Sequence, residues 1–179
     1  MAHVLPPRDP SPVSLGLLYN RLVTRIRDYK PEDFDELWNI DQQCFAAGIA
    51  YSRRELAAYM RRSRAFTLIA VDDASRILGF IVAESDHTGV GHILTLDVRP
   101  TAQRTGLGTQ LLLRAQSRLL HENCSAVLLE TAVDNAVALS FYKRHGYSVL
   151  ETIPRYYLDS VDALVMGRHL KPPPKAEKS

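Results

Sequence analysis

One segment of the sequence joins the end of an apolar run to a loop with two glycines and the start of a long amphipathic stretch. It reads Val98-Arg-Pro-Thr-Ala-Gln-Arg-Thr-Gly-Leu-Gly-Thr109. N–H groups at the start of a helix lack partners within the helix and carry partial positive charge, and glycines let a phosphate approach them closely. The lysine of a P-loop does not follow, and the glycine spacing differs from the dinucleotide fingerprint. The segment indicates an anion site made of main-chain N–H groups, with an ordinary strand-to-helix turn as the alternative.

A single carboxylate, Glu130, interrupts the otherwise apolar run 126–133. A charge in the middle of an apolar strand is costly unless it is hydrogen-bonded or faces a water-filled cleft. In a cleft such a carboxylate can serve as a general base near neutral pH. The alternatives are a buried structural pair or an ion pair with a nearby arginine.

The segment 134–147 places an asparagine before a helical pattern that carries two adjacent aromatic residues. Asn135 is of a type that caps helices through its side-chain oxygen. Phe141 and Tyr142 are typical of core packing in such a helix. Tyr142 becomes a candidate for chemistry if its hydroxyl points into a cleft beside Glu130.

Hydrophobic periodicity predicts the elements that position these residues. Strands are expected over 23–27, 66–71, 77–83, 93–98, 126–133, 147–153 and 163–168. One helix is expected to begin at Pro31, and a second at Ser52, where Glu55 completes a capping box. A third begins near Gly106, and a fourth covers 135–145 and ends at Gly146. The order is β-α-α-β-β-β-α-β-α-β-β.

Length and charge limit the possible classes of protein. The chain has 179 residues, which fits one domain, and its net charge of +2 is too balanced for a dedicated nucleic-acid binder. No stretch reaches the roughly 20 apolar residues that a membrane helix needs, and no signal peptide is recognisable. We therefore expect a cytoplasmic protein with no nucleic-acid or membrane partner, present as a monomer or weak dimer.

Proline-rich ends flank the expected domain. We expect residues 1–20 to be disordered or loosely packed, residues 21–170 to form the domain, and residues 171–179 to be a disordered Pro/Lys tail. The histidines and the two cysteines lack metal-ligand spacing, so no metal is expected, and both thiols are interpreted as packing residues.

Two blocks of this sequence resemble those of the GNAT superfamily of N-acetyltransferases. Gln103-x-x-Gly106-x-Gly108 resembles the family's pyrophosphate loop. Asn135…Ala138…Phe141-Tyr142…Gly146-Tyr147 resembles its downstream Asn-x-x-Ala-x-x-x-Tyr-x-x-x-Gly-Phe block. The resemblance extends over about residues 22–170.

Three further segments are similar to the RimI-type Nα-acetyltransferases, which include the ribosomal-protein alanine acetyltransferase. They are His92-Ile-Leu-Thr-Leu96-Asp-Val98, Leu129-Glu130, and Arg155-Tyr156-Tyr157 followed by Asp162-Ala163 and Met166. His92 matches a histidine common in these relatives and is interpreted here as structural. After Phe45 the sequence departs from these relatives, since it reads Ala-Ala-Gly-Ile-Ala-Tyr in place of a proline-containing segment.

The resemblance implies an α/β (α+β) fold with a mixed, mostly antiparallel sheet splayed between its fourth and fifth strands and flanked by about four helices. It implies acetyl-CoA as the cosubstrate, with no metal. Backbone groups of Leu96 and Val98 would bind the pantetheine arm, and Asn135 and Tyr142 would flank its thiol end. The pyrophosphate would be held by Gln103, Arg104, Thr105, Gly106, Leu107, Gly108 and Thr109.

The resemblance also implies the roles of the acid, the base and the acceptor site. Glu130 would deprotonate the amine through a water molecule, and Tyr142 would protonate the departing thiolate. The amine would attack the thioester directly, and a backbone N–H of the splayed strand would stabilise the oxyanion. The acceptor, a protein or peptide N-terminus, would contact Phe45, Tyr51, Tyr156 and Tyr157. The alternatives are a GNAT enzyme for a lysine side chain or small amine, and a non-catalytic acyl-CoA sensor.

Overall fold

The computed structural model describes residues 25–45, 49–158 and 160–170. The two proline-rich ends, for which we expected disorder, lie outside these ranges, as does the beginning of the first expected strand. The chain forms one seven-stranded sheet in the order β1-β2-β3-β4-β5-β7-β6. Its strands are β1 Arg25–Asp28, β2 Ala65–Val71, β3 Ile77–Ser85, β4 Val90–Val98, β5 Ala126–Ala132, β6 Ser148–Tyr157 and β7 Val161–His169.

Four α-helices and two short 3-10 turns complete the described part of the chain. The helices are α2 Phe34–Cys44, α3 Arg53–Met60, α4 Leu107–His121 and α5 Ala136–Arg144. The 3-10 turns are Pro31–Asp33 and Pro100–Ala102. Ser52 caps α3 in the predicted capping box with Glu55, and Asn135 caps α5 as predicted.

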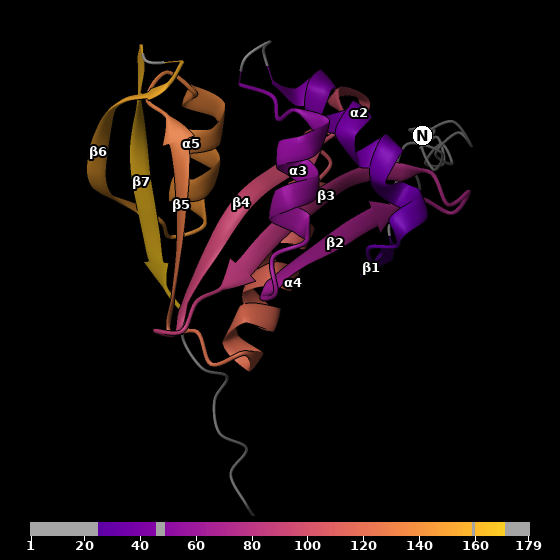
Figure 1. The fold of residues 1–179 in the computed structure, drawn as a ribbon, viewed down its shortest axis with the longest axis horizontal. Coiled ribbons are helices and arrows are strands. Elements are labelled where there is room, and N and C mark those ends of the chain that lie inside the picture. The colour runs from indigo at the N-terminus through magenta and orange to yellow at the C-terminus, as the bar shows by residue number, and fades with distance from the viewer. Residues whose placement is uncertain (1–24, 46–48, 159, 171–179) are drawn as a thin grey trace, which may run out of the picture.

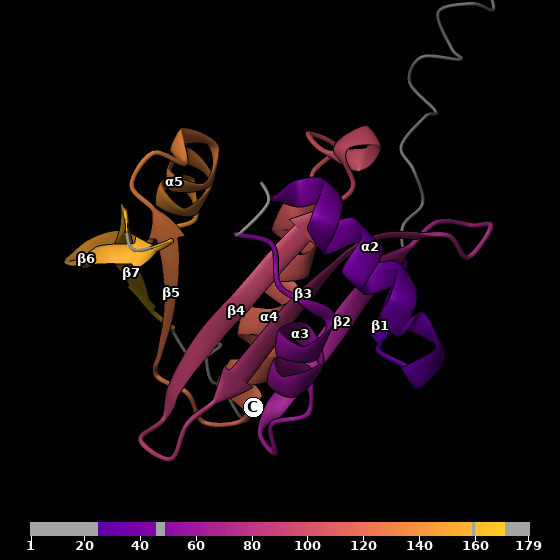
Figure 2. The same cartoon turned by 45° about the horizontal axis from the view of Figure 1, so that its top comes forward.

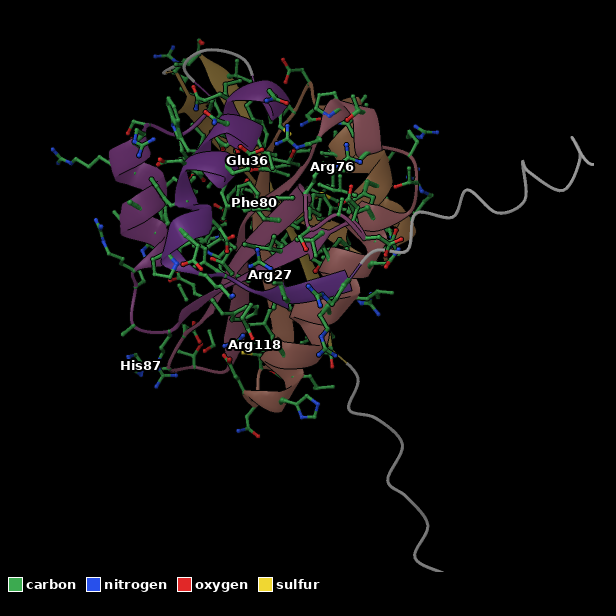
Figure 3. The ribbon with its side chains drawn as sticks, turned by 90° about the vertical axis from the view of Figure 1, so that its right-hand side faces the viewer. Arg27, Glu36, Arg76, Phe80, His87 and Arg118 are labelled. Carbon is green, nitrogen blue, oxygen red and sulfur yellow. The ribbon has the colours of Figure 1, made fainter. Side chains whose placement is uncertain are left out.

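The helices cover both faces of the β1–β4 part of the sheet. Helices α2 and α3 lie on one face and α4 lies on the other (Figures 1 and 2). On the α2 side, Leu37 and Leu56 pack in one cluster with Phe80 of β3, which is fully buried (Figure 3). On the α4 side, the predicted apolar stripe is buried in a second cluster with strand residues. It consists of Leu107, Leu111, Leu112, Ala115 and Leu119.

The sheet divides into two parts between β4 and β5. These two strands are parallel and pair only from Val90–His92 to Ala126–Leu128. Beyond that point β4 remains paired with β3 up to Val98, while β5 pairs with β7 along its whole length. Figure 1 shows the two strands meeting at one end of the sheet and separating towards α5 and α2. The expected mixed, splayed sheet is therefore confirmed.

The main difference from the predicted elements concerns β6. Sequence patterning ended this strand at Ile153, but it continues to Tyr157 through Pro154. Proline is tolerated because β6 is the edge of the sheet, where one side of the strand has no ladder to complete. The register with β7 shifts between Ile153 and Tyr157, and Arg155 has a positive φ of 54°. This irregular end carries Tyr156 and Tyr157 towards the region where β4 and β5 separate.

Candidate active site

A cleft of about 400 Å³ opens where β4 and β5 separate. Both strands, the end of α2 and the start of α5 contribute to its walls. The lining residues are Cys44, Phe45, Ile49, Tyr51, Ile93–Leu96, Leu129–Ala132, Asp134, Asn135, Ala138, Tyr142 and Tyr157. Of the residues singled out from the sequence, the cleft thus brings together Phe45, Tyr51, Leu96, Glu130, Asn135, Tyr142 and Tyr157.

Three other expected parts of the site lie outside this lining. The loop 103–109 stands at the start of α4, Val98 follows the lined part of β4, and Tyr156 is half-exposed on β6. The Tyr156 ring packs edge-on against that of Tyr157, with 4.9 Å between their centroids. Tyr156 also lies close enough to Glu130 for that carboxylate to contribute to the raised pKa of its phenol, after the larger effect of burial.

Glu130 is held by His92, a residue that the sequence interpretation treated as structural. His92 Nε2 and Glu130 Oε2 are 2.6 Å apart, and the two side chains are 34% and 21% exposed. His92 is opposite Leu128 in the short β4–β5 ladder, and Glu130 is two residues further along β5, on the same face. An ionised carboxylate can only accept, so the imidazole donates to it from Nε2. The signal that could have found this pair is the shared face of two neighbouring strands, which requires the register.

Tyr142 enters the cleft from α5 with most of its surface covered. Its ring packs edge-on against those of Phe141 and Tyr147, at centroid distances of 5.1 and 5.4 Å. Burial, followed by the nearby Tyr147 and Asp97, raises the pKa of Tyr142 well above its ordinary value. The hydroxyl is therefore protonated throughout the pH range in which an enzyme would work. This residue can donate a hydrogen bond into the cleft.

Tyr51 is fixed on the opposite wall by four hydrogen bonds. Its N–H donates to Asp41 Oδ2 at 2.9 Å, and its hydroxyl donates to the carbonyl of Leu94 on β4 at 3.2 Å. Its own carbonyl accepts from Trp38 Nε1 at 3.1 Å and from Gln42 Nε2 at 2.9 Å. Burial raises the pKa of this phenol, so it too is neutral. These bonds tie the segment after α2 to the strand that forms the floor of the cleft.

The start of α4 presents main-chain N–H groups with little side-chain cover. Gly106 is the N-cap and has a left-handed φ of 87°, a conformation that glycine adopts without strain. The first helical bond runs from Gln110 N–H to the Gly106 carbonyl, so the N–H groups of residues 107–109 precede it. The side chains of Thr105 and Thr109 turn inwards, to the Ala102 carbonyl at 2.8 Å and to His145 Nε2 at 3.1 Å.

One backbone group expected to meet a pantetheine arm is already engaged. The carbonyl of Val98 accepts from Gln103 Nε2 at 3.0 Å and from Cys44 Sγ at 3.3 Å. Asn135 is likewise occupied in part, because its Oδ1 accepts from Ala138 N–H at 3.0 Å as the helix cap. The available surface for a pantetheine arm is the β4 edge between His92 and Val98, where the ladder to β5 has ended.

The described part of the chain contains neither a membrane-spanning helix nor a group of side chains that could hold a metal ion. Within residues 25–45, 49–158 and 160–170, no helix is long and apolar enough to cross a membrane. In that same part of the chain, no three side chains of His, Cys, Asp or Glu are placed to hold a metal ion.

The comparison with protein families identifies one match. The model of the Acetyltransferase (GNAT) family matches residues 34–147. An uncharacterised N-acetyltransferase of Methanocaldococcus jannaschii is 31% identical over 142 residues, which are 79% of this chain and 88% of that protein. N-alpha-acetyltransferase 30 of Schizosaccharomyces pombe is 29% identical over 117 residues, 63% of this chain and 77% of that protein.

Solved structures share the fold. The crystal structure of Ard1 from Thermoplasma volcanium has a TM-score of 0.76 and 26% identity, and covers 84% of this chain and 100% of its own. A chain in the crystal structure of the NatC complex bound to Gag peptide and CoA has a TM-score of 0.71 and 25% identity. The match covers 83% of this chain and 99% of that one.

The left-handed Gly106 at the start of α4 predicts a specific response to substitution. Gly106→Ala is expected to lower the free energy of unfolding by about 1–2 kcal/mol, because an L-residue is strained in this conformation. An added methyl group would meet nothing within 4 Å, so the cost is conformational. Gly108→Ala is the control. Its methyl group would reach Phe141 at 3.6 Å, an ordinary contact, in a helix that alanine favours. Urea denaturation that shows equal effects for the two variants would contradict this interpretation.

Proposed function

The chain belongs to the Acetyltransferase (GNAT) family and is an N-acetyltransferase, and we propose that it acetylates the α-amino group of a protein or peptide N-terminus from acetyl-CoA. The observation that carries this proposal is the cleft lined by Glu130, Tyr142, Tyr51 and Tyr157. It combines a proton acceptor, a protonated phenol and an aromatic wall at the point where the sheet opens. The names of the relatives support the choice of acceptor, since they include an N-alpha-acetyltransferase and a complex bound to a peptide.

Acetyl-CoA fits two surfaces of this fold. The N–H groups at the start of α4 suit the pyrophosphate, because unpaired N–H groups and the helix dipole favour anions there. The β4 edge beyond His92 suits the pantetheine arm, since it has no ladder bonds to β5. The two surfaces are consecutive along the chain, so a ligand held at both would place its thioester in the cleft.

The first chemical requirement is removal of a proton from the acceptor ammonium. An α-ammonium has a reference pKa of about 8, against about 10.4 for lysine, so its deprotonation costs about 3 kcal/mol less at a given pH. Glu130 accepts this proton, directly or through one water molecule. His92 is a positioning residue in this scheme, because its 2.6 Å contact holds the carboxylate in one orientation.

The free amine then attacks the thioester carbonyl. A new C–N bond forms and the carbonyl electrons move to oxygen. As they return, the C–S bond breaks and the sulfur leaves as a thiolate, while the attacking nitrogen loses its second proton, which passes to that thiolate. A main-chain N–H on the open edge of β4 stabilises the oxyanion. Tyr142 donates a hydrogen bond to the departing sulfur. Because the pKa of this phenol is raised above that of a thiol, its contribution is to stabilise the thiolate and relay a proton rather than to act as a strong acid.

Two matched peptides test the choice of acceptor. One has a free N-terminus and acetyl-blocked lysines, and the other has a blocked N-terminus and free lysines. Incubation with acetyl-CoA followed by fragmentation mass spectrometry is expected to place the new acetyl group on the α-nitrogen of the first peptide. Acetylation of only the second peptide, or of small amines only, would contradict the proposal and favour another GNAT substrate. Binding of acetyl-CoA with no turnover on any amine would favour the sensor alternative.

Replacement of the proton acceptor should reduce turnover. Glu130→Gln is expected to lower kcat by about 10²–10⁴-fold, the usual contribution of a positioned general base. The loss should be greatest near neutral pH, where the acceptor is mostly protonated, and smaller at high pH. The control is Glu151→Gln, which removes an exposed carboxylate from β6. An unaltered pH–rate profile in Glu130→Gln, measured in the steady state, would remove the base role.

Removal of the Tyr142 hydroxyl should lower turnover and leave the affinity for acetyl-CoA nearly unchanged. Tyr142→Phe keeps the ring packing but loses the donor, so kcat should fall by about 10²-fold while the Kd for acetyl-CoA changes little. Tyr147→Phe is the control, since this buried phenol bonds Gln116 and is not part of the cleft lining. Steady-state kinetics and equilibrium titration of CoA measure the two quantities. An unchanged kcat in Tyr142→Phe would exclude the donor role.

A further inference from the structure

Two carboxyl groups are buried behind the side of the cleft that Tyr51 forms, which we call the acceptor wall. Asp41 on α2 is 0% exposed and Asp97 on β4 is 1% exposed. Each has one oxygen with no hydrogen-bond partner in the described part of the chain, Oδ1 of Asp41 and Oδ2 of Asp97. Burial of an ionised carboxylate without a partner is costly, and two such groups near each other add their repulsion.

The two carboxyls belong to elements that are in contact. Cys44 Sγ donates to the Val98 carbonyl at 3.3 Å, so the last turn of α2 lies on the end of β4. Asp41 is one turn before Cys44, and Asp97 is next to Val98. Burial and the charge of Asp41 raise the pKa of Asp97 well above its ordinary value, and burial raises the pKa of Asp41 to about 6.

The remaining oxygens of the pair hold the structure in place. Asp41 Oδ2 accepts from the N–H of Tyr51 at 2.9 Å and from Gln42 Nε2 at 3.0 Å. Asp97 Oδ1 accepts from Thr95 Oγ1 at 2.8 Å. Through Asp41, the pair fixes Tyr51, whose hydroxyl bonds the Leu94 carbonyl and whose ring lines the cleft. A change of charge on the pair would therefore act directly on the acceptor wall.

No cation compensates this pair within the described residues. The groups that act on the two carboxyls are Asp41 itself, Thr95, Gln42 and the Tyr51 N–H. The other titratable groups that sense Asp97 are the Cys44 thiol of α2, the Tyr51 phenol before α3 and the Tyr142 phenol of α5. All three are neutral, since burial raises their pKa values. A bound proton is then the remaining way to lower the charge of the pair.

We propose that Asp41 and Asp97 form one positioning unit that holds at least one proton and thereby keeps α2 and Tyr51 against β4. The unit sets the acceptor wall of the cleft while it is protonated and loosens it when both carboxyls ionise. It touches neither reacting group, so both aspartates are positioning residues. The effect on acceptor binding rests on the proposed function. The claim that the pair retains a proton does not depend on it.

The direction of the pH dependence follows from the raised pKa values. A carboxyl whose pKa is higher in the folded than in the unfolded chain stabilises the fold most below about pH 4, where both forms are protonated. This stability is lost as the pH rises towards the folded pKa, which is about 6 for Asp41 and is also raised for Asp97. Asp33, Asp72 and Asp86 have lowered pKa values. Their contribution to the stability of the fold is therefore lost as the pH falls below about 4.

Asp97→Asn in the full chain tests the proposal, because asparagine resembles the protonated acid and cannot ionise. The Tm of the wild type is expected to fall as the pH rises from 5 to 9, and that of Asp97→Asn to change much less. The acceptor KM of the wild type should rise relative to that of the variant by up to about tenfold per pH unit once the pair ionises. Dividing the KM of the wild type by that of the variant cancels the effect of pH on the acceptor amine, which is the same for both proteins.

Asp72→Asn is the matched control. Asp72 is also buried, but it pairs with Arg76 in the β2–β3 turn and its pKa is lowered. This variant should keep the wild-type slope of Tm above pH 5. Equal slopes in the wild type and in Asp97→Asn would overturn the proposal.

Carbon-13 NMR of the aspartate carboxyls gives a readout on the wild type that does not depend on a variant folding or on any acceptor. At least one buried carboxyl should remain protonated above pH 6. Titration of every carboxyl near its ordinary value of about 3.9 would overturn the proposal, whether or not the chain acetylates peptides.

Discussion

The separation of β4 from β5 after three paired positions is the constraint on which the rest of the structure depends. β4 belongs to the β1–β4 part of the sheet, which α2, α3 and α4 cover, and β5 belongs to the β5–β7 part. Backbone groups along the separated edges must find partners outside the ladder. Side chains supply some of them, since Tyr51 reaches the Leu94 carbonyl and Cys44 and Gln103 reach that of Val98. The remaining edge has no ladder partner, and the proposed catalytic residues Glu130 and Tyr142 line the cleft beside it.

The proposed site for the anionic cosubstrate requires little net charge on the chain. Its net charge is only +2, and several arginines are occupied by acids, as in the pairs of Arg27 with Asp33 and Arg62 with Glu84. The start of α4 offers main-chain N–H groups instead, and its threonine side chains bond protein partners. In the proposed scheme the main chain recognises the cosubstrate, and side chains in the cleft act on protons.

Local patterns predicted much of the fold and several residues of the candidate site. The helix caps at Ser52 and Asn135, the glycine at the start of α4 and the solitary Glu130 were all readable, because each is a local departure from a periodic pattern. The GNAT resemblance supplied the splayed sheet. The pairing of His92 with Glu130 was missed because the two residues are 38 positions apart and meet only through the register between β4 and β5. The continuation of β6 through Pro154 depends on its edge position, and the burial of Asp41 beside β4 depends on how α2 packs; neither is a local property.

Hydrogen–deuterium exchange with and without CoA measures most directly whether the opened edge of β4 and the start of α4 form the cosubstrate surface. Bound CoA should slow the exchange of amides in residues 93–98 and 107–109, which would gain phosphate or pantetheine partners. Amides of β2 and the β2–β3 turn should be unaffected. Protection confined to β6 and β7, or no protection at saturating CoA, would contradict a cosubstrate site at the point where the sheet divides.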